Sequence, residues 1–163
     1  MEQTLYELAV EVGSALKARA LTLATAESCT GGWVGTAVTA VPGSSEWYER
    51  GFITYTNTAK NEMLGVAADT LDKFGAVSEQ TVKAMVTGAL ANSHAQVAVA
   101  VSGVAGPSGG TPAKPVGTIC LAWGRSGGEP HAETCHFAGD REAVRRQSVE
   151  RALEGVLRLL NNA

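Results

Sequence analysis

The feature that most constrains the fold is an apolar segment that leads into a glycine-rich loop. Residues 96–101 read Gln-Val-Ala-Val-Ala-Val, and residues 102–110 contain four glycines and a proline. A short apolar run of this kind is typical of a strand buried on both faces, between layers of helices. Open α/β sheets bind their ligands in loops at the carboxyl ends of such strands. The pattern favours a ligand loop at residues 102–110, with a plain surface loop as the alternative.

Hydrophobic periodicity predicts that helices and strands alternate along the rest of the chain. Helices are expected over 4–18, from the turn at 27–33 to about 41, over 46–50, 57–64, 79–93 and 141–160. Strands are expected over 21–26, 52–55, 96–101, 118–123 and 131–137, the last two forming a hairpin. No repeat or linker divides the chain. We therefore predict one domain over residues 1–163, an α/β/α three-layer fold with a mixed, mostly buried sheet.

Composition excludes several classes of function. The net charge is −3 and no long basic run is present, so nucleic-acid binding is not expected. No apolar stretch approaches the roughly 20 residues that span a membrane, and the N-terminus lacks a signal-peptide pattern. Three cysteines at unrelated spacings indicate reduced thiols and a cytoplasmic protein. The three histidines lack metal-ligand spacing, so no metal site is expected.

A serine pair and a lysine stand on either side of a short predicted strand. Pro42-Gly43 predicts a turn, and Ser44 and Ser45 are suited to cap the short helix that follows. Lys60 falls in the first turn of the next helix, where the helix N-terminus disfavours an ammonium. A neutral lysine that meets a serine hydroxyl can take its proton. An ordinary cap and an exposed lysine are the alternative reading.

A second candidate site is the turn Glu27-Ser28-Cys29-Thr30-Gly31-Gly32-Trp33, which follows a predicted strand and opens a helix. Such turns present backbone N–H groups to anions. The turn is neither a dinucleotide fingerprint nor a P-loop. Cys29 at a helix start would be a possible nucleophile, with packing as the alternative, and Ser28 has a similar claim. Arg141, in the first turn of the last helix, is either solvated or placed to meet an anion.

Several segments together resemble the C-terminal domain family of the competence/damage-inducible protein CinA. The resemblance rests on the blocks Ala26–Gly32, Pro42–Ser45, Gly51–Asn57 with Lys60, Gly75–Ser78, Ser102–Gly110, Lys114–Thr118 and Gly139–Arg141 with Arg145. The match covers nearly the whole chain. It implies an α/β fold, self-association with a dimer expected, and no metal or organic cofactor.

The resemblance also implies an activity, the hydrolysis of the carboxamide of nicotinamide mononucleotide in pyridine-nucleotide recycling. By the family pattern Ser45 is the nucleophile, Lys60 its base and Tyr55 an assisting group. The choice of Ser45 over Ser44 rests on the family motif, because capping does not distinguish them. An acyl-enzyme on the serine is the expected intermediate.

The residues that the resemblance places around the substrate are Glu27, Ser28, Thr30, Gly31, Gly32, Ser102, Gly103 and Arg141. Ser102 and Gly103 are expected to supply oxyanion N–H groups, and Arg141 with the turn at 30–32 to hold the phosphate. Three alternatives stay open: a mononucleotide-binding regulatory module without catalysis, an amidase with Cys29 as nucleophile, and a different nucleotide amide as substrate.

Overall fold

The chain forms one five-stranded mixed sheet between two layers of helices, which confirms the predicted fold class. The computed structural model describes residues 3–162. The strand order is β2-β1-β3-β4-β5, with β1 parallel to both of its neighbours and β4 antiparallel to β3 and β5. The strands are β1 (Leu23–Glu27), β2 (Tyr48–Ile53), β3 (Val97–Gly103), β4 (Thr118–Arg125) and β5 (His131–His136). The helices are α1 (Gln3–Ala18), α2 (Trp33–Thr39), α3 (Asn57–Leu64), α4 (Ala68–Phe74), α5 (Glu79–Ala91), α6 (Arg141–Asn161) and the 3-10 turn η1 (Ser44–Glu46).

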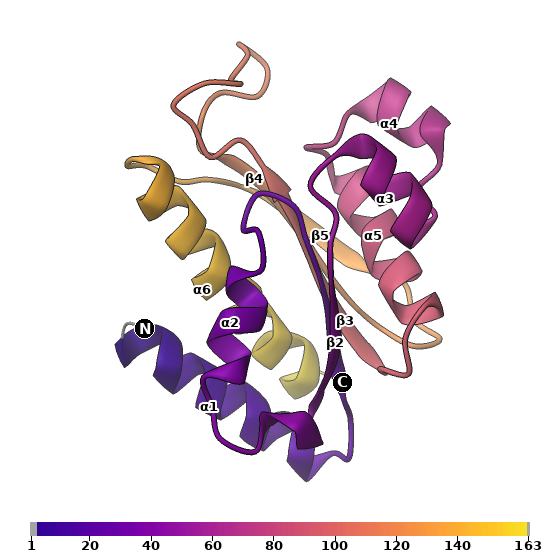
Figure 1. The fold of residues 1–163 in the computed structure, drawn as a ribbon, viewed down its shortest axis with the longest axis vertical. Helices are drawn as coiled ribbons and strands as arrows, with labels where there is room; N and C mark the ends of the chain where they lie inside the picture. Colours follow the sequence, from indigo (N-terminus) through magenta and orange to yellow (C-terminus); the bar gives the residue numbers. More distant parts are fainter. Residues whose placement is uncertain (1–2, 163) are drawn as a thin grey trace.

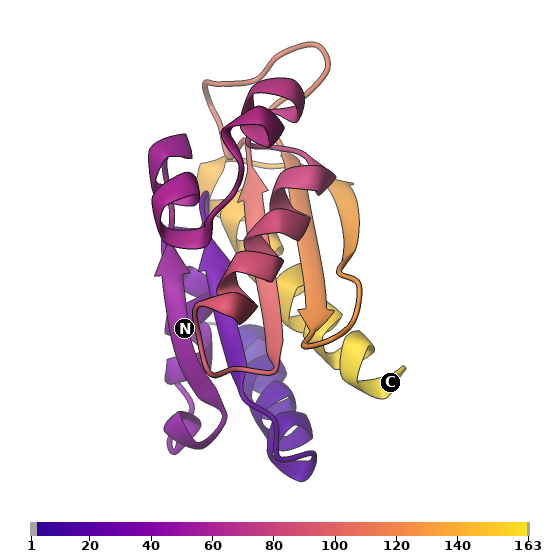
Figure 2. The ribbon, with the colours of Figure 1, turned by 90° about the vertical axis from the view of Figure 1, so that its right-hand side faces the viewer.

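The helices form two layers that cover opposite faces of the sheet. In Figure 1 the sheet is seen nearly edge-on, with α1, α2 and α6 on one side and α3, α4 and α5 on the other. Figure 2 shows α5 lying across the near face of the sheet. Among residues 3–162, no helix is long and apolar enough to cross a bilayer.

The alternation of valine and alanine in β3 explains both faces of the core. Val97, Val99 and Val101 point into the cluster formed with α1, α2 and α6, whereas Ala98 and Ala100 point to α5. All five side chains are buried. Because successive side chains of a strand face opposite ways, the larger residues fill one layer and the small ones let α5 approach the other.

One local prediction was wrong. The sequence predicted a helix over 46–50, ended by Gly51, and a strand over 52–55. Instead η1 ends at Glu46 and β2 already begins at Tyr48. Gly51 lies inside the strand because the Tyr48 hydroxyl, which is 2.9 Å from Thr25 Oγ1, occupies the space that a Cβ at residue 51 would fill. The glycine therefore marks a close approach between side chains and not a helix end.

The parallel arrangement gathers three chain segments at one edge of the sheet. Ser28 follows β1, Thr54 follows β2, and the loop after Gly103 follows β3. Chain connections leave the neighbouring strands β1 and β2 towards opposite helical layers at this edge, β1 to α2 and β2 to α3, which is the usual ligand position in open α/β sheets. The loop over residues 104–117 rises above it at the top of Figure 1.

Helix α3, which carries Lys60, is held in place by close contact with α5. The cap of α3 is Thr56, whose hydroxyl accepts from the Ala59 N–H, and Gly65 ends the helix at φ 69°. A Cβ at Gly88 of α5 would overlap the carbonyl group of Leu64. The position of the Lys60 helix thus depends on a glycine in the neighbouring helix.

We predict that Gly88→Ala lowers the free energy of unfolding by about 3 kcal/mol, because a clash with backbone is not relieved by a rotamer change. Helix propensity alone would favour alanine by about 1 kcal/mol. Urea denaturation measures the difference. Gly128→Ala is the control, since its Cβ would come no closer than 3.6 Å to another group. A stabilised Gly88→Ala variant would contradict this packing.

Candidate active site

The centre of the candidate site is a buried lysine whose amine is hydrogen-bonded to oxygens of neutral groups. Lys60 is 1% exposed. Its Nζ lies 2.9 Å from Ser28 Oγ, 2.9 Å from the Thr54 carbonyl oxygen and 3.4 Å from the Tyr55 carbonyl oxygen. The Ser28 hydroxyl is itself 3.3 Å from the Tyr55 carbonyl. The end of β1 and the segment that links β2 to α3 thus enclose one amine and one hydroxyl.

Burial lowers the pKa of Lys60 below its usual 10.5, because the ammonium loses its water without gaining a carboxylate partner. The sequence had suggested the α3 N-terminus as the cause. Desolvation is instead the dominant effect, and the nearby Cys29 acts weakly in the opposite direction. The environment thus shifts the equilibrium of Lys60 towards the neutral amine, which is the form that can accept a proton.

The structure does not bring the predicted pair, Ser45 and Lys60, together. Ser45 is exposed in η1, before β2 begins, whereas Lys60 follows the end of β2. A strand of six residues separates the two ends by roughly 20 Å. The neighbouring Glu46 forms an ion pair at 2.8 Å with Lys17, at the end of α1. The intervening strand carries the chain away instead of returning it, so the serine beside Lys60 is Ser28.

The carboxylate of Glu27 organises the turn that carries Ser28. Glu27 is 2% exposed, and its two oxygens accept four hydrogen bonds. The donors are the Thr30 hydroxyl at 2.6 Å and the N–H groups of Gly32, Val34 and Gly35 at 3.2, 2.9 and 3.0 Å. The Glu27 carboxylate and the Thr30 hydroxyl thus bond to the turn itself, and the expected place of Glu27 and Thr30 around a substrate stays a prediction. Gly31 and Gly32, with φ of 58° and 105°, supply the left-handed backbone that the turn requires.

Cys29 is a poor candidate for the nucleophile. Its side chain is 6% exposed and packs in the core, although it reaches the wall of the pocket. Burial raises the pKa of the Cys29 thiol to about 12. A thiol in this state carries almost no thiolate at neutral pH, and the thiolate is the reactive form.

A pocket of about 290 Å³ opens beside these residues. Its walls are formed by Cys29, Tyr55, Gly103, Val104, Ala105, Gly106, Ser108, Gly109 and Arg141. Arg141 donates to the Gly106 carbonyl at 2.7 Å and to the Tyr55 hydroxyl at 3.1 Å. Much of the 102–110 loop thus lines a pocket, and that this loop binds a ligand stays a prediction. The Tyr55 hydroxyl lies at the rim with Arg141, and it is the Tyr55 carbonyl that contacts the amine.

The residues expected to supply oxyanion N–H groups are only partly suited to that role. Ser102 is 1% exposed and pairs with Cys120 inside the sheet, whereas Gly103 reaches the pocket wall. A residue that the sequence noted only within a matching block is Arg145. Its guanidinium contacts the Ser28 turn, and its place one helical turn after Arg141 on α6 is the signal that could have found it.

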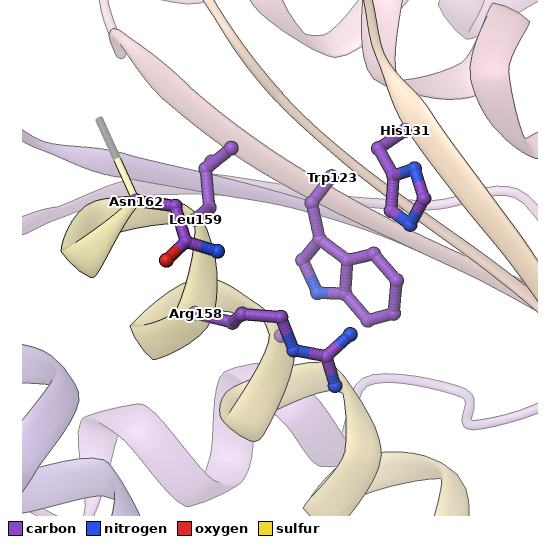
Figure 3. A pocket seen from close by; sticks show the side chains of 6 residues that line it. Trp123, His131, Arg158, Leu159 and Asn162 are labelled. Atoms are coloured by element: carbon purple, nitrogen blue, oxygen red, sulfur yellow. The ribbon is translucent and has the colours of Figure 1, made fainter.

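One other hollow is chemically different from the candidate site. Figure 3 shows one of about 330 Å³ where the end of α6 meets the β4–β5 hairpin, with Trp123 stacked on His131 and Arg158 beside them. It is mainly apolar and lies away from Lys60. Within residues 3–162, no cluster of three or more acidic, histidine or cysteine side chains could hold a metal ion.

The fold and the buried amine–hydroxyl pair define a class of α/β domain with a polar site at the carboxyl ends of parallel strands. Comparison with known proteins identifies the family. Residues 5–160 match the model of the CinA C-terminal domain. The chain therefore belongs to the CinA C-terminal domain family, as its sequence motifs predicted.

Individual relatives match this chain over nearly its whole length. A protein of Pseudomonas putida named nicotinamide-nucleotide amidohydrolase PncC is 55% identical over 93% of this chain and 94% of its own. The protein of the same name from Escherichia coli is 51% identical over 94% and 93%. A crystal structure titled competence/damage inducible protein CihA from Agrobacterium tumefaciens has a TM-score of 0.95 and 44% identity, covering 99% of this chain and 98% of that one.

The buried lysine predicts a pH dependence of stability. We expect the wild type to gain stability relative to Lys60→Met as the pH rises from the lowered pKa of folded Lys60 towards 10.5. In that window the unfolded chain binds more protons than the folded one at this residue, so raising the pH favours folding. Urea denaturation of both proteins between about pH 7 and pH 10 measures the slope. A difference that stays constant or falls with pH would contradict a desolvated amine.

Proposed function

We propose that this chain hydrolyses the carboxamide of nicotinamide mononucleotide to nicotinate mononucleotide and ammonia, with Ser28 as nucleophile and Lys60 as general base. The observation that carries the proposal is the 2.9 Å separation of Ser28 Oγ and Lys60 Nζ in a buried setting that lowers the pKa of the amine. The names of the relatives supply the substrate.

The two carbonyl groups beside Lys60 determine the direction of proton transfer. A neutral amine has two N–H donors and one lone pair. In the structure Lys60 Nζ donates to Ser28 Oγ, and the Ser28 hydroxyl donates to the Tyr55 carbonyl. In the neutral amine the Thr54 and Tyr55 carbonyls can accept both N–H groups, and the Ser28 O–H then turns to the lone pair. Lys60 takes this proton as Ser28 Oγ attacks the amide carbon. The carbonyls then stabilise the ammonium that forms.

The remaining steps use the same pair of groups. Collapse of the tetrahedral intermediate breaks the C–N bond, and the Lys60 ammonium gives its proton to the departing nitrogen, which leaves as ammonia. Water then attacks the acyl-Ser28 carbonyl with Lys60 again as base, and nicotinate mononucleotide is released. Tyr55, which the sequence suggested as a proton relay, acts through its backbone carbonyl and, through its hydroxyl, at the pocket rim.

The phosphate of the substrate is assigned to the Arg141 side of the pocket. Arg141 is exposed and lines the pocket beside the glycine-rich loop, and a guanidinium is suited to bind phosphate. As further parts of the proposal, the chain acts in pyridine-nucleotide recycling, is cytoplasmic and self-associates as a dimer. The relatives' names favour catalysis over a purely binding role, and tight binding of nicotinamide mononucleotide without turnover would favour the regulatory module instead.

We predict that Ser28→Ala lowers the rate of ammonia release from nicotinamide mononucleotide by about 10⁴-fold or more, because it removes the nucleophile. Ser45→Ala, the matched control, should keep wild-type activity, since Ser45 lies at the other end of β2. Cys29→Ala should also remain active.

The assay is continuous detection of ammonia with purified proteins whose folding is checked by circular dichroism. Wild-type activity in Ser28→Ala would contradict Ser28 as the nucleophile. Loss of activity in Ser45→Ala would favour Ser45, in η1, as the nucleophile. Loss in Cys29→Ala alone would favour a thiol mechanism.

A further inference from the structure

The turn that carries Ser28 is held from outside by Arg145 of α6. Arg145 Nε donates to the Cys29 carbonyl and Nη2 to the Thr30 carbonyl, each at 3.1 Å. The guanidinium also stacks over the Trp33 ring, 5.5 Å from its centroid. Two donors and an aromatic face fix the orientation of this side chain, and hence of the two peptide groups it contacts.

The hydrogen bonds of the turn leave two of its backbone N–H groups without an acceptor on another described residue. The Ser28 N–H donates to the Val101 carbonyl, the Gly31 N–H to the Ser28 carbonyl, and the N–H of Gly32 to Glu27. Within residues 3–162, the N–H groups of Cys29 and Thr30 find no acceptor on another residue. Unpaired backbone N–H groups at a largely buried turn are uncommon, because leaving a donor unsatisfied costs free energy.

We propose that Arg145 is a positioning residue that orients the N–H groups of Cys29 and Thr30 as the oxyanion hole for the tetrahedral intermediate on Ser28. The N–H of the residue after a nucleophilic serine is the usual donor in such turns. The Thr30 N–H belongs to the same peptide group as the Cys29 carbonyl, so the cation on that carbonyl polarises the donor. This inference rests on the proposed function and replaces the N–H groups of Ser102 and Gly103 in this role.

The test compares Arg145→Ala, Arg145→Lys and Arg158→Ala in steady-state hydrolysis of nicotinamide mononucleotide. Arg158 lies on the same helix and pairs with Glu133 at 3.6 Å, so its variant is the matched control. We expect kcat of Arg145→Ala to fall on the order of 100-fold, as for one lost oxyanion donor, with KM within about threefold of wild type. Arg145→Lys, which reaches one carbonyl, should lie between, and added guanidinium ion should restore part of the Arg145→Ala activity.

A KM increase at unchanged kcat would overturn the proposal and assign Arg145 to the phosphate. Unchanged kinetics in both Arg145 variants would overturn it as well. If Arg145→Ala does not fold, Arg145→Lys, which keeps the charge and the stem, decides.

A second measurement is independent of turnover. Amide hydrogen exchange over residues 28–32 of the substrate-free protein should quicken in Arg145→Lys and stay unchanged in Arg158→Ala. A wild-type protein that releases no ammonia overturns the proposed function. Unchanged exchange in Arg145→Lys overturns the present inference alone.

Discussion

The candidate site depends on the placement of one amine out of contact with water and among neutral oxygens. Lys60 is buried beneath the end of β1 and contacts a hydroxyl and two carbonyl groups instead of a carboxylate. A carboxylate partner would have held the ammonium and raised its pKa, whereas desolvation lowers it. The free-energy cost of burying this side chain is offset by the rest of the fold, in particular by the contact between α3 and α5.

The sheet brings the partners of that amine together. Because β1, β2 and β3 run parallel, their carboxyl ends lie at one edge, and three segments distant in sequence meet there. Helix α6 then fixes two of these segments: Arg141 contacts the loop after β3, and Arg145 contacts the turn after β1. A scaffold of rigid elements thus positions loops that carry the polar groups, as is common in α/β enzymes.

Much of the fold could be predicted from the sequence, because most of its helices and strands arise from patterns among neighbouring residues. The buried strand β3, the helix α5 and the hairpin of β4 and β5 all follow from hydrophobic periodicity. The β2 boundary was missed because Gly51 serves a tertiary contact with Tyr48, which no local rule reveals. The sequence identified Lys60 as the candidate base. Its burial depends on tertiary packing, which local sequence patterns do not reveal.

The identity of the serine could not be predicted from spacing. Ser28 is 32 residues from Lys60 and Ser45 only 15, yet the nearer residue lies at the far end of the intervening strand. The most direct test of the account is rapid acid quenching of the protein with nicotinamide mononucleotide, followed by mass spectrometry of the peptides. We predict that fragmentation of the labelled peptide places the acyl group on Ser28 itself. An acyl group placed on Ser45 or on Cys29 would contradict this mechanism.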